Sequence, residues 1–285
     1  MQTSSINKAY ITILGIAQDA GYPQINCEEE YCAEAWESLK LQRTPACLAI
    51  VDPLTKEQWM IDATPEIKHQ LYHLKKISGS DKISGIFLTH AHIGHYTGLM
   101  YLGKEALNTN NMPVFAMSKM KLFLKKNAPW NQLNELKNIQ LIELKNNSHV
   151  NLNNTISISP FLVPHRNEFS ETVGYNITIN NSTIIYIPDI DSWQDLDFSI
   201  HNLIKTCDYA FLDGTFYKNN ELGRNIKEIP HPTVHESMKL FANLSARDKK
   251  KIHFIHFNHT NPIISNKKFR KQNVLDKGFN LAYEG

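Results

Sequence analysis

Three histidines within six residues form the densest group of metal-ligating side chains in this chain. His90, His92 and His95 lie in the segment Thr-His-Ala-His-Ile-Gly-His-Tyr. The neutral imidazole ring binds divalent transition metals at pH 7. An apolar run over 83–88 precedes the histidines and has the composition of a buried strand. Surface histidines that are neighbours by chance are the alternative, but three in six residues after a strand favour a metal site.

Further ligand candidates lie at the ends of later apolar runs. Each run has the composition of a strand, and alternation along the last one places His256 on the same face as Phe254. Taken singly, these candidates have ordinary explanations as hydrogen-bonded histidines or a turn-forming aspartate. Their order along the chain instead favours strand ends that meet around one cavity. The six predicted metal ligands are His90, His92, His95, His165, Asp189 and His256.

The elements that must position these residues form a repeated pattern of strands and helices. Strands are predicted at 9–15, 47–51, 58–62, 83–88, 114–116, 139–144, 155–163, 174–179, 183–187, 209–212 and 252–257. Helices are predicted at about 64–76, from residue 96, from residue 118, at about 195–204 and at about 233–244. This order favours an α/β fold of two face-to-face mixed sheets flanked by helices. Because no low-complexity linker interrupts the pattern, residues 1–285 are predicted to form one domain.

Composition argues against several classes of partner. The 285 residues carry 30 Lys and Arg against 28 Asp and Glu, and a formal charge of +2 does not suit a nucleic-acid surface. No apolar stretch approaches the roughly 20 residues that span a bilayer, and the N-terminus lacks the layout of a signal peptide. The four cysteines do not suggest a disulfide framework. We therefore expect a cytoplasmic protein that acts on a small molecule, with the oligomeric state left open and a homodimer among the options.

The histidine segment resembles the signature of the metallo-β-lactamase superfamily. In that signature a strand leads into His-x-His-x-Asp-His and then Gly-Leu, and here Thr-His-Ala-His-Ile-Gly-His is followed by Tyr-Thr-Gly-Leu. The resemblance implies an αββα sandwich that holds one or two zinc ions, with manganese or iron as alternatives. The ligands that it implies for the first ion are His90, His92 and His165. Those that it implies for the second ion are His95 and His256, with Asp189 bridging both ions.

Gly94 departs from this signature, because it stands where the superfamily has an aspartate. The second ion thereby loses a charged ligand, and we expect it to bind more weakly, with water in the open positions. The first set of histidines, together with Asp189, remains complete and would serve as a single-metal centre.

Two branches of the superfamily are similar to this chain outside the signature. Residues 14–27, 163–168 and 254–262 resemble the pyrroloquinoline-quinone biosynthesis protein B family, and the N-terminal cysteines and paired late histidines resemble the cyclic phosphodiesterase of phosphonate breakdown. In both branches, cysteines near the N-terminus hold a structural zinc. The residues that the resemblance implies for this zinc are Cys27, Cys32 and His259. Since the relatives use three clustered cysteines and this chain has two, either a glutamate completes the site or the site is vestigial.

The favoured function is a metal-dependent hydrolase of a small ester or phosphodiester, in which a metal-bound hydroxide is the nucleophile. Asp189 would orient this hydroxide. Because the signature aspartate is missing, the leaving group would take its proton from His95, His231 or His235. The last two lie at the start of a predicted helix, where exposed helix-start residues are the plainer explanation.

Arg166 and His235 are the substrate-binding candidates. The guanidinium fork of Arg166 suits a carboxylate or phosphate group of a substrate. An ion pair with Glu168 or Glu171 is the ordinary alternative. The loops at 16–46 and 214–231 are expected to line the pocket.

The sequence is also compatible with two other functions. An open-sided site of histidines and one carboxylate also suits ferrous iron, which favours an iron-dependent oxygenase of the kind that the protein B resemblance suggests. A metal-binding protein that lost its activity together with the signature aspartate is the non-enzymatic alternative.

Overall fold

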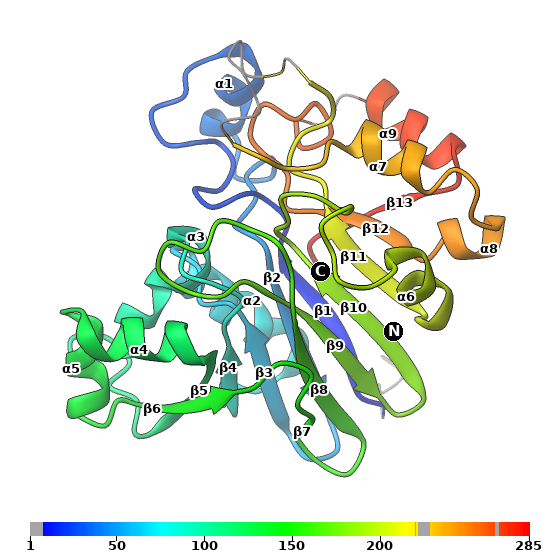
Figure 1. Ribbon diagram of the computed structural model, residues 1–285. Helices are drawn as coiled ribbons and strands as arrows, with labels where there is room; N and C mark the ends of the chain where they lie inside the picture. The colour runs from blue at the N-terminus through cyan, green and yellow to red at the C-terminus, as the bar shows by residue number, and fades with distance from the viewer. Residues whose placement is uncertain (1–7, 220, 222–228, 266–267) are drawn as a thin grey trace, which may run out of the picture.

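Two β-sheets pack face to face, and helices cover their outer surfaces, in the computed structural model (Figure 1). The structure describes residues 8–219, 221, 229–265 and 268–285. This arrangement is an αββα sandwich, so the predicted α/β fold class is confirmed.

The first sheet contains six strands that are neighbours in chain order. They are β1 (Tyr10–Gly15), β2 (Cys47–Asp52), β3 (Glu57–Ile61), β4 (Gly85–Phe87), β5 (Met112–Met117) and β6 (Ile139–Leu144). All six residues of β2 are buried, because both faces of this strand are covered. Leu48 and Ile50 belong to the core between the sheets, whereas Ala49 and Val51 belong to the core under the helices.

The second sheet has the strand order β13-β12-β11-β10-β9-β8-β7. In chain order the strands are β7 (Val150–Asn151), β8 (Ile156–Leu162), β9 (Val173–Ile179), β10 (Ser182–Ile187), β11 (Tyr209–Asp213), β12 (Ile252–Ile255) and β13 (Asn280–Leu281). Strands β10 to β13 pair in parallel, and β7 to β10 pair antiparallel. As a result, β8, β10, β11 and β12 all point their carboxyl ends to the same edge of the sheet.

The helices divide between the two outer faces (Figure 1). The group on the first sheet is α2 (Ile67–Ser78), α3 (Ile93–Tyr96), a 3-10 helix η1 (Thr97–Leu102), α4 (Ser118–Lys126) and α5 (Trp130–Glu135). The group on the second sheet is α6 (Ile200–Thr206), α7 (Val234–Leu240), α8 (Ala246–Lys249) and α9 (Lys268–Asp276). Helix α1 (Glu30–Glu37) lies in the loop region above the strand ends. None of the helices in the described ranges is long and apolar enough to span a membrane.

Several predicted helix boundaries were wrong for local reasons. The helix expected from residue 96 is the short α3 followed by η1, and Leu107 beyond it is 53% exposed. Gly98 in this segment packs so closely on the preceding loop that a Cβ there would lie 2.1 Å from the Thr64 carbonyl oxygen. The helix expected at 195–204 begins at Ile200, where the Ser199 side chain caps it. Helix α1 was not predicted.

Candidate metal centre

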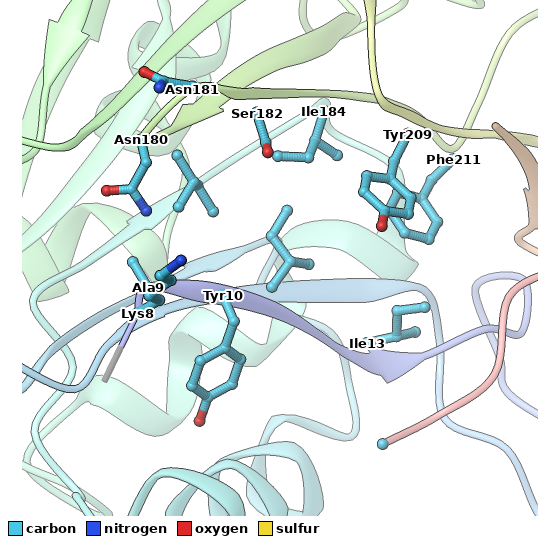
Figure 2. Close-up of a pocket in the computed structure, with 13 residues that line it drawn as sticks. Lys8, Ala9, Tyr10, Ile13, Asn180, Asn181, Ser182, Ile184, Tyr209 and Phe211 are labelled. Carbon is cyan, nitrogen blue, oxygen red and sulfur yellow. The ribbon is translucent and has the colours of Figure 1, made fainter. Parts of the chain in front are cut away.

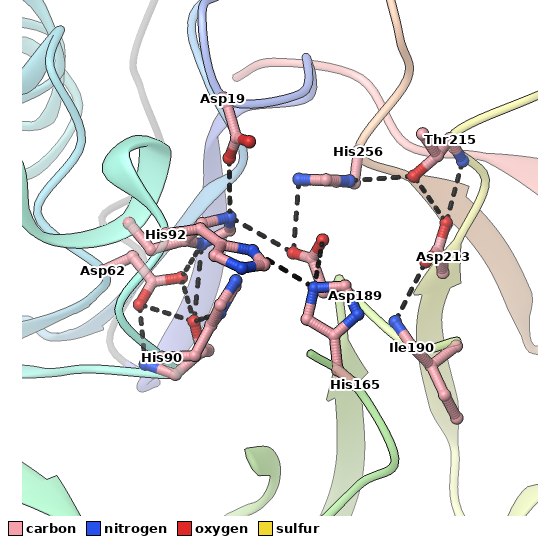
Figure 3. A network of polar contacts seen from close by, with 12 residues as sticks. Asp19, Asp62, His90, His92, His165, Asp189, Ile190, Asp213, Thr215 and His256 are labelled. Carbon is pink, nitrogen blue, oxygen red and sulfur yellow. Dashed lines mark hydrogen bonds and ion pairs between the residues drawn. The ribbon is translucent and has the colours of Figure 1, made fainter. Parts of the chain in front are cut away.

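The six predicted metal ligands meet at one edge of the sandwich (Figure 3). The first three follow β4, and the others come within three residues of the ends of β8, β10 and β12. Carboxyl ends of parallel strands commonly form the ligand site of an α/β protein. The prediction placed His256 inside a strand over 252–257, but β12 ends at Ile255 and His256 lies outside it. It follows β12 with a φ of 66°, a left-handed conformation that is uncommon for residues other than glycine.

The first ligand set is His90, His92 and His165, each of which offers one ring nitrogen within 4.8 Å of the others. His165 Nε2 lies 3.2 Å from His92 Nδ1. The other ring nitrogen of His165 contacts Asp191 Oδ1 at 2.6 Å, so Nε2 is the atom that faces the set. Similarly, His90 Nδ1 lies 3.0 Å from Thr89 Oγ1, which leaves His90 Nε2 for the centre.

The second ligand set contains a residue that the sequence did not predict. One ligand atom each from Asp19, His95 and His256 lie within 4.8 Å of one another. The distance from His95 Nε2 to Asp19 Oδ1 is 3.3 Å. Asp19 lies in the loop after β1, far from the histidine signature in the sequence.

Asp189 lies between the two sets. Its Oδ1 is 3.7 Å from His165 Nε2 in the first set. Its Oδ2 is 3.1 Å from His95 Nε2 and 3.2 Å from His256 Nε2 in the second set. Because each carboxylate oxygen faces a different set, Asp189 has the geometry of a bridging ligand.

The centre contains several buried polar atoms that a metal ion would satisfy. Within the described parts of the chain, five of its atoms lack a hydrogen-bond partner: Asp19 Oδ1, His90 Nε2, His95 Nε2, Asp189 Oδ2 and His256 Nε2. A buried polar atom without a hydrogen bond is destabilising, and coordination to a metal ion would remove that penalty. The donor set of imidazole and carboxylate suits zinc, manganese or iron, so these residues fit a metal ion.

An outer layer of polar side chains orients the ligands. Asp62 Oδ2 accepts from His95 Nδ1 at 2.7 Å, and its Oδ1 accepts from the Thr89 backbone N–H at 2.8 Å. Thr215 Oγ1 lies 3.0 Å from His256 Nδ1. Such contacts fix the ring orientation of metal-binding histidines. Asp62 and the other outer-layer carboxylates were not predicted from the sequence.

The charge states of the ligands suit metal binding. Burial lowers the pKa of His90 and His256, and lowers that of His92 to about 4, so these imidazoles are neutral at pH 7. Although burial acts in the opposite direction, the surrounding histidines hold the pKa of Asp189 well below its usual value. For His95, the neighbouring aspartates outweigh burial and hold its pKa well above the usual value. A metal ion would therefore displace a proton from His95.

His231 lies beside the centre and is paired with a buried carboxylate. Its Nδ1 contacts Asp213 Oδ2 at 2.7 Å. Asp189, Asp213 and His231 each offer a ligand atom within 4.8 Å of the others. The His231 ring centroid is 5.4 Å from that of His165. Asp213 outweighs burial and raises the pKa of His231, which favours the protonated form of an imidazole next to the candidate metal ligands.

Arg166 lies close enough to the centre to act electrostatically on its histidines. Its Nε is buried and has no hydrogen-bond partner within residues 8–219 or the other described ranges. Its positive charge adds to burial in lowering the pKa of His92, and it acts on His231 in the same direction. The alternative ion pairs do not form in this part of the chain: Glu168 lies 3.8 Å from His92 Nε2, and Glu171 accepts from the start of α4.

His235 does not share the surroundings of the ligands, contrary to its expected role in proton transfer or substrate binding. It lies on α7, where the charged groups that act on it are Lys239, Lys277 and Glu236. Thr233 and Glu236 form a capping box at the start of this helix. His235 is therefore a helix-start residue, which was the plainer explanation.

The predicted structural zinc ligands are only partly brought together. Cys27 and Cys32 are buried free thiols, and burial together with the neighbouring Cys27 thiol raises the pKa of Cys32 to about 12. The His259 ring lies 5.7 Å from the Tyr31 ring. Cys27, Cys32 and His259 do not form one of the candidate metal clusters in the described residues. A structural zinc at these residues stays a prediction.

A separate cavity of about 660 Å³ lies between the two sheets at the other end of the strands (Figure 2). Tyr10 at the start of β1, Ile184 near the start of β10 and Tyr209 at the start of β11 line it. The metal ligands follow the ends of these strands, so this cavity is not part of the metal centre. Residues 220 and 222–228, within a loop that was expected to line the substrate pocket, lie outside the described residues.

The sandwich architecture, with histidines and aspartates at its carboxyl-end edge, defines a protein of the metallo-β-lactamase fold. The family model of the β-lactamase superfamily domain matches residues 58–254, and the chain belongs to this superfamily.

Sequence similarity to known proteins extends over nearly the whole chain. Coenzyme PQQ synthesis protein B of Klebsiella pneumoniae is 26% identical, and the match covers 97% of this chain and 96% of the relative. The protein of the same name from Acinetobacter baylyi is also 26% identical, with 96% and 98% covered.

Solved structures share the fold. Zn²⁺-bound PqqB from Methylobacterium extorquens has a TM-score of 0.79 and 21% identity, with 96% of this chain and 98% of that chain covered. A diphosphatase from the PhnP family has a TM-score of 0.67 and 21% identity, with 98% and 95% covered. Both branches that the sequence resembles are therefore among its structural neighbours.

Proposed function

We propose that this protein is a metal-dependent hydrolase of a small ester or phosphodiester. The observation that carries the proposal is the position of Asp189, which directs one carboxylate oxygen to each ligand set. Close carboxylate-bridged metal sites occur in phosphatases and nucleases, where two ions stabilise the attacking and leaving oxygens. The diphosphatase among the structural neighbours supports the same class of reaction.

A metal ion at these ligands would supply an activated water at neutral pH and polarise the carbonyl or phosphoryl oxygen of the substrate. Asp189 orients the attacking water through the oxygen that it directs to each set. Protonated His231, held by Asp213 at 2.7 Å, donates a proton to the leaving oxygen. Arg166 binds the anionic oxygen of the substrate, since its buried Nε has no partner in the described residues.

The test is a hydrolysis assay on protein stripped with a chelator and reloaded with Zn²⁺ or Mn²⁺. The substrates are bis(p-nitrophenyl) phosphate and p-nitrophenyl acetate. We expect turnover only after reloading. His231→Gln should lower kcat by about 10²- to 10⁴-fold, the usual contribution of a general acid, while His235→Gln on α7 serves as the control and should stay near wild type.

Arg166→Gln separates binding from chemistry in the same assay. It should raise KM for the phosphodiester and leave KM for the neutral ester nearly unchanged. Reloaded protein that hydrolyses neither these substrates nor a wider panel of diesters would contradict the proposal and favour a metal-binding protein without hydrolytic activity.

A second candidate is an iron-dependent oxygenase of the protein B type. The observation in its favour is the similarity to Coenzyme PQQ synthesis protein B along 97% of this chain. Histidine and carboxylate ligands also suit ferrous iron. Elemental analysis of protein purified without chelator or affinity metal distinguishes the two candidates. Mainly zinc or manganese supports the hydrolase, whereas mainly iron, with oxygen consumed on adding candidate substrates, supports the oxygenase.

A further inference from the structure

The space beside Gly94 is filled by another residue. A Cβ atom built on Gly94 would lie 2.2 Å from Asp19 Oδ1, 2.4 Å from Asp19 Cα and 2.9 Å from Asp19 Cβ. No real side chain tolerates such distances, so residue 94 must be glycine while Asp19 occupies this position. The carboxylate that the signature lacks at position 94 is thus replaced in space by a carboxylate from the loop after β1.

Three pairs of donor atoms in the second set and Asp189 have the spacing of neighbouring metal ligands. His95 Nε2 lies 3.3 Å from Asp19 Oδ1 and 3.1 Å from Asp189 Oδ2, and Asp189 Oδ2 lies 3.2 Å from His256 Nε2. Neighbouring ligand atoms lie about 3.3 Å apart when the bonds to the metal are about 2.0–2.1 Å long. All four atoms are buried and lack hydrogen-bond partners within the described residues.

The backbone holds Asp19 next to the segment that carries His256. The Gln18 backbone N–H donates to the Phe257 carbonyl at 2.9 Å, and the Phe257 N–H donates to the Ile16 carbonyl at 2.8 Å. On the other side of Asp19, the N–H of Gly21 donates to the Gln18 carbonyl and closes a turn. These backbone hydrogen bonds to Phe257 hold Asp19 close to His256, although the two residues lie far apart in the sequence.

We propose that Asp19 is a ligand of the second metal ion and takes the place of the missing signature aspartate. The site then has two carboxylates, Asp19 and Asp189, and two imidazoles, His95 and His256. The carboxylate charge of the second site is restored, so the weaker binding expected from Gly94 alone does not apply. This inference rests on the metal centre of the proposed function and goes beyond it, because it assigns a ligand outside the histidine signature.

The test counts ions and does not depend on turnover. Chelator-stripped protein is titrated with Zn²⁺ by calorimetry, and the bound zinc per chain is counted by elemental analysis after removing free metal. Relative to wild type, Asp19→Asn should lose the second zinc or bind it at least tenfold more weakly. Binding of the first zinc should be unchanged. Asp197→Asn, which changes an exposed carboxylate on the same protein, should match wild type.

A variant at position 94 gives the second arm. A Cβ there would lie 2.4 Å from the Asp19 Cα as well as 2.2 Å from its Oδ1, so Gly94→Ala must displace the backbone that carries Asp19. Gly94→Ala should therefore weaken the same ion as Asp19→Asn does and leave the other ion bound. Wild-type binding of both ions in Gly94→Ala would overturn the role of Asp19.

The outcomes separate this inference from the proposed function. Wild-type zinc stoichiometry and affinity in Asp19→Asn would overturn the role of Asp19 and leave the hydrolase proposal standing. Loss of both ions in Asp19→Asn would also overturn it, because Asp19 would then act on the fold. A Co²⁺-loaded sample gives an independent reading, since a lost ligand alters the visible absorption of the second ion.

Discussion

The two ligand sets of the metal centre are supplied by the chain in different ways. The first set takes two residues from one loop, His90 and His92, and adds His165 from the loop after β8. The second set takes its residues from three segments spread over most of the sequence, at residues 19, 95 and 256. Both arrangements offer donor atoms of similar spacing around Asp189. The comparison shows that a ligand position can be kept in space while the residue that fills it moves to another segment.

The sharpest test of the comparison is the residue that the sets share. Asp189→Ala should remove the tight binding of both ions, because its two oxygens face different sets. Hydrolytic kcat should fall by about a thousandfold, equivalent to about 4 kcal/mol of transition-state stabilisation. Zinc counting and the diester assay measure the two effects. If only one ion were lost, Asp189 would belong to a single set and the sets would not be bridged.

Removing one histidine from each set should break the sets separately. His165→Ala should abolish binding of the first ion, and His256→Ala should abolish binding of the second. In each variant the other ion should still bind. Calorimetric titration with Zn²⁺ gives two binding steps in wild type and one in each variant. The two variants together keep the prediction specific, since identical losses in both would mean that the ions bind only as a pair.

The outer-layer carboxylates should show the same division with a smaller effect. Asp62→Asn removes the carboxylate that contacts His95, and Asp191→Asn removes the one that contacts His165. Loss of such a contact usually weakens metal binding by about 10- to 100-fold. We expect Asp62→Asn to weaken the second ion and Asp191→Asn the first. Competition with a chelator of known affinity measures each change, and an effect on the opposite ion would contradict the division.

The smallest effect is expected at the solvent-facing side of the first set. Glu168 is 54% exposed and lies 3.8 Å from His92 Nε2. Because His92 is neutral at pH 7, this exposed contact should contribute no more than the roughly 0.2–1 kcal/mol of an exposed ion pair, so Glu168→Gln should change the affinity of the first ion by less than about fivefold. A larger loss in the same competition experiment would make Glu168 a ligand and enlarge the first set.

Most of the fold could be predicted from the sequence, because apolar runs and alternation report directly on burial. Strand β2 illustrates this, since its unbroken apolar stretch matches a strand covered on both faces. Local geometry was harder to predict. The left-handed conformation of His256 depends on the loop that follows β12, and the 3-10 turn at 97–102 depends on the close contact of Gly98 with a distant carbonyl.

The candidate site was predictable where its residues belong to a known pattern. Asp19, Asp62 and Asp213 were missed because their roles arise from tertiary contacts that no local pattern encodes. Gly94 showed that a carboxylate was missing from the signature, but the chain has 28 Asp and Glu residues, and the sequence does not say which of them fills the gap. That information lies in the packing of the β1 loop against the segment after β12.

The pairing of this loop with the Phe257 segment also has a consequence for how the chain assembles. The second set cannot be completed until residue 256 has been synthesised, although residue 19 is among the first to leave the ribosome. An ion bound there would cross-link segments near the two ends of the polypeptide and close a loop that spans most of the chain. Because the entropy of closing a loop rises with its length, this ion would restrict the unfolded chain more than an ion held by neighbouring residues, and it could do so only after nearly the whole chain has been made.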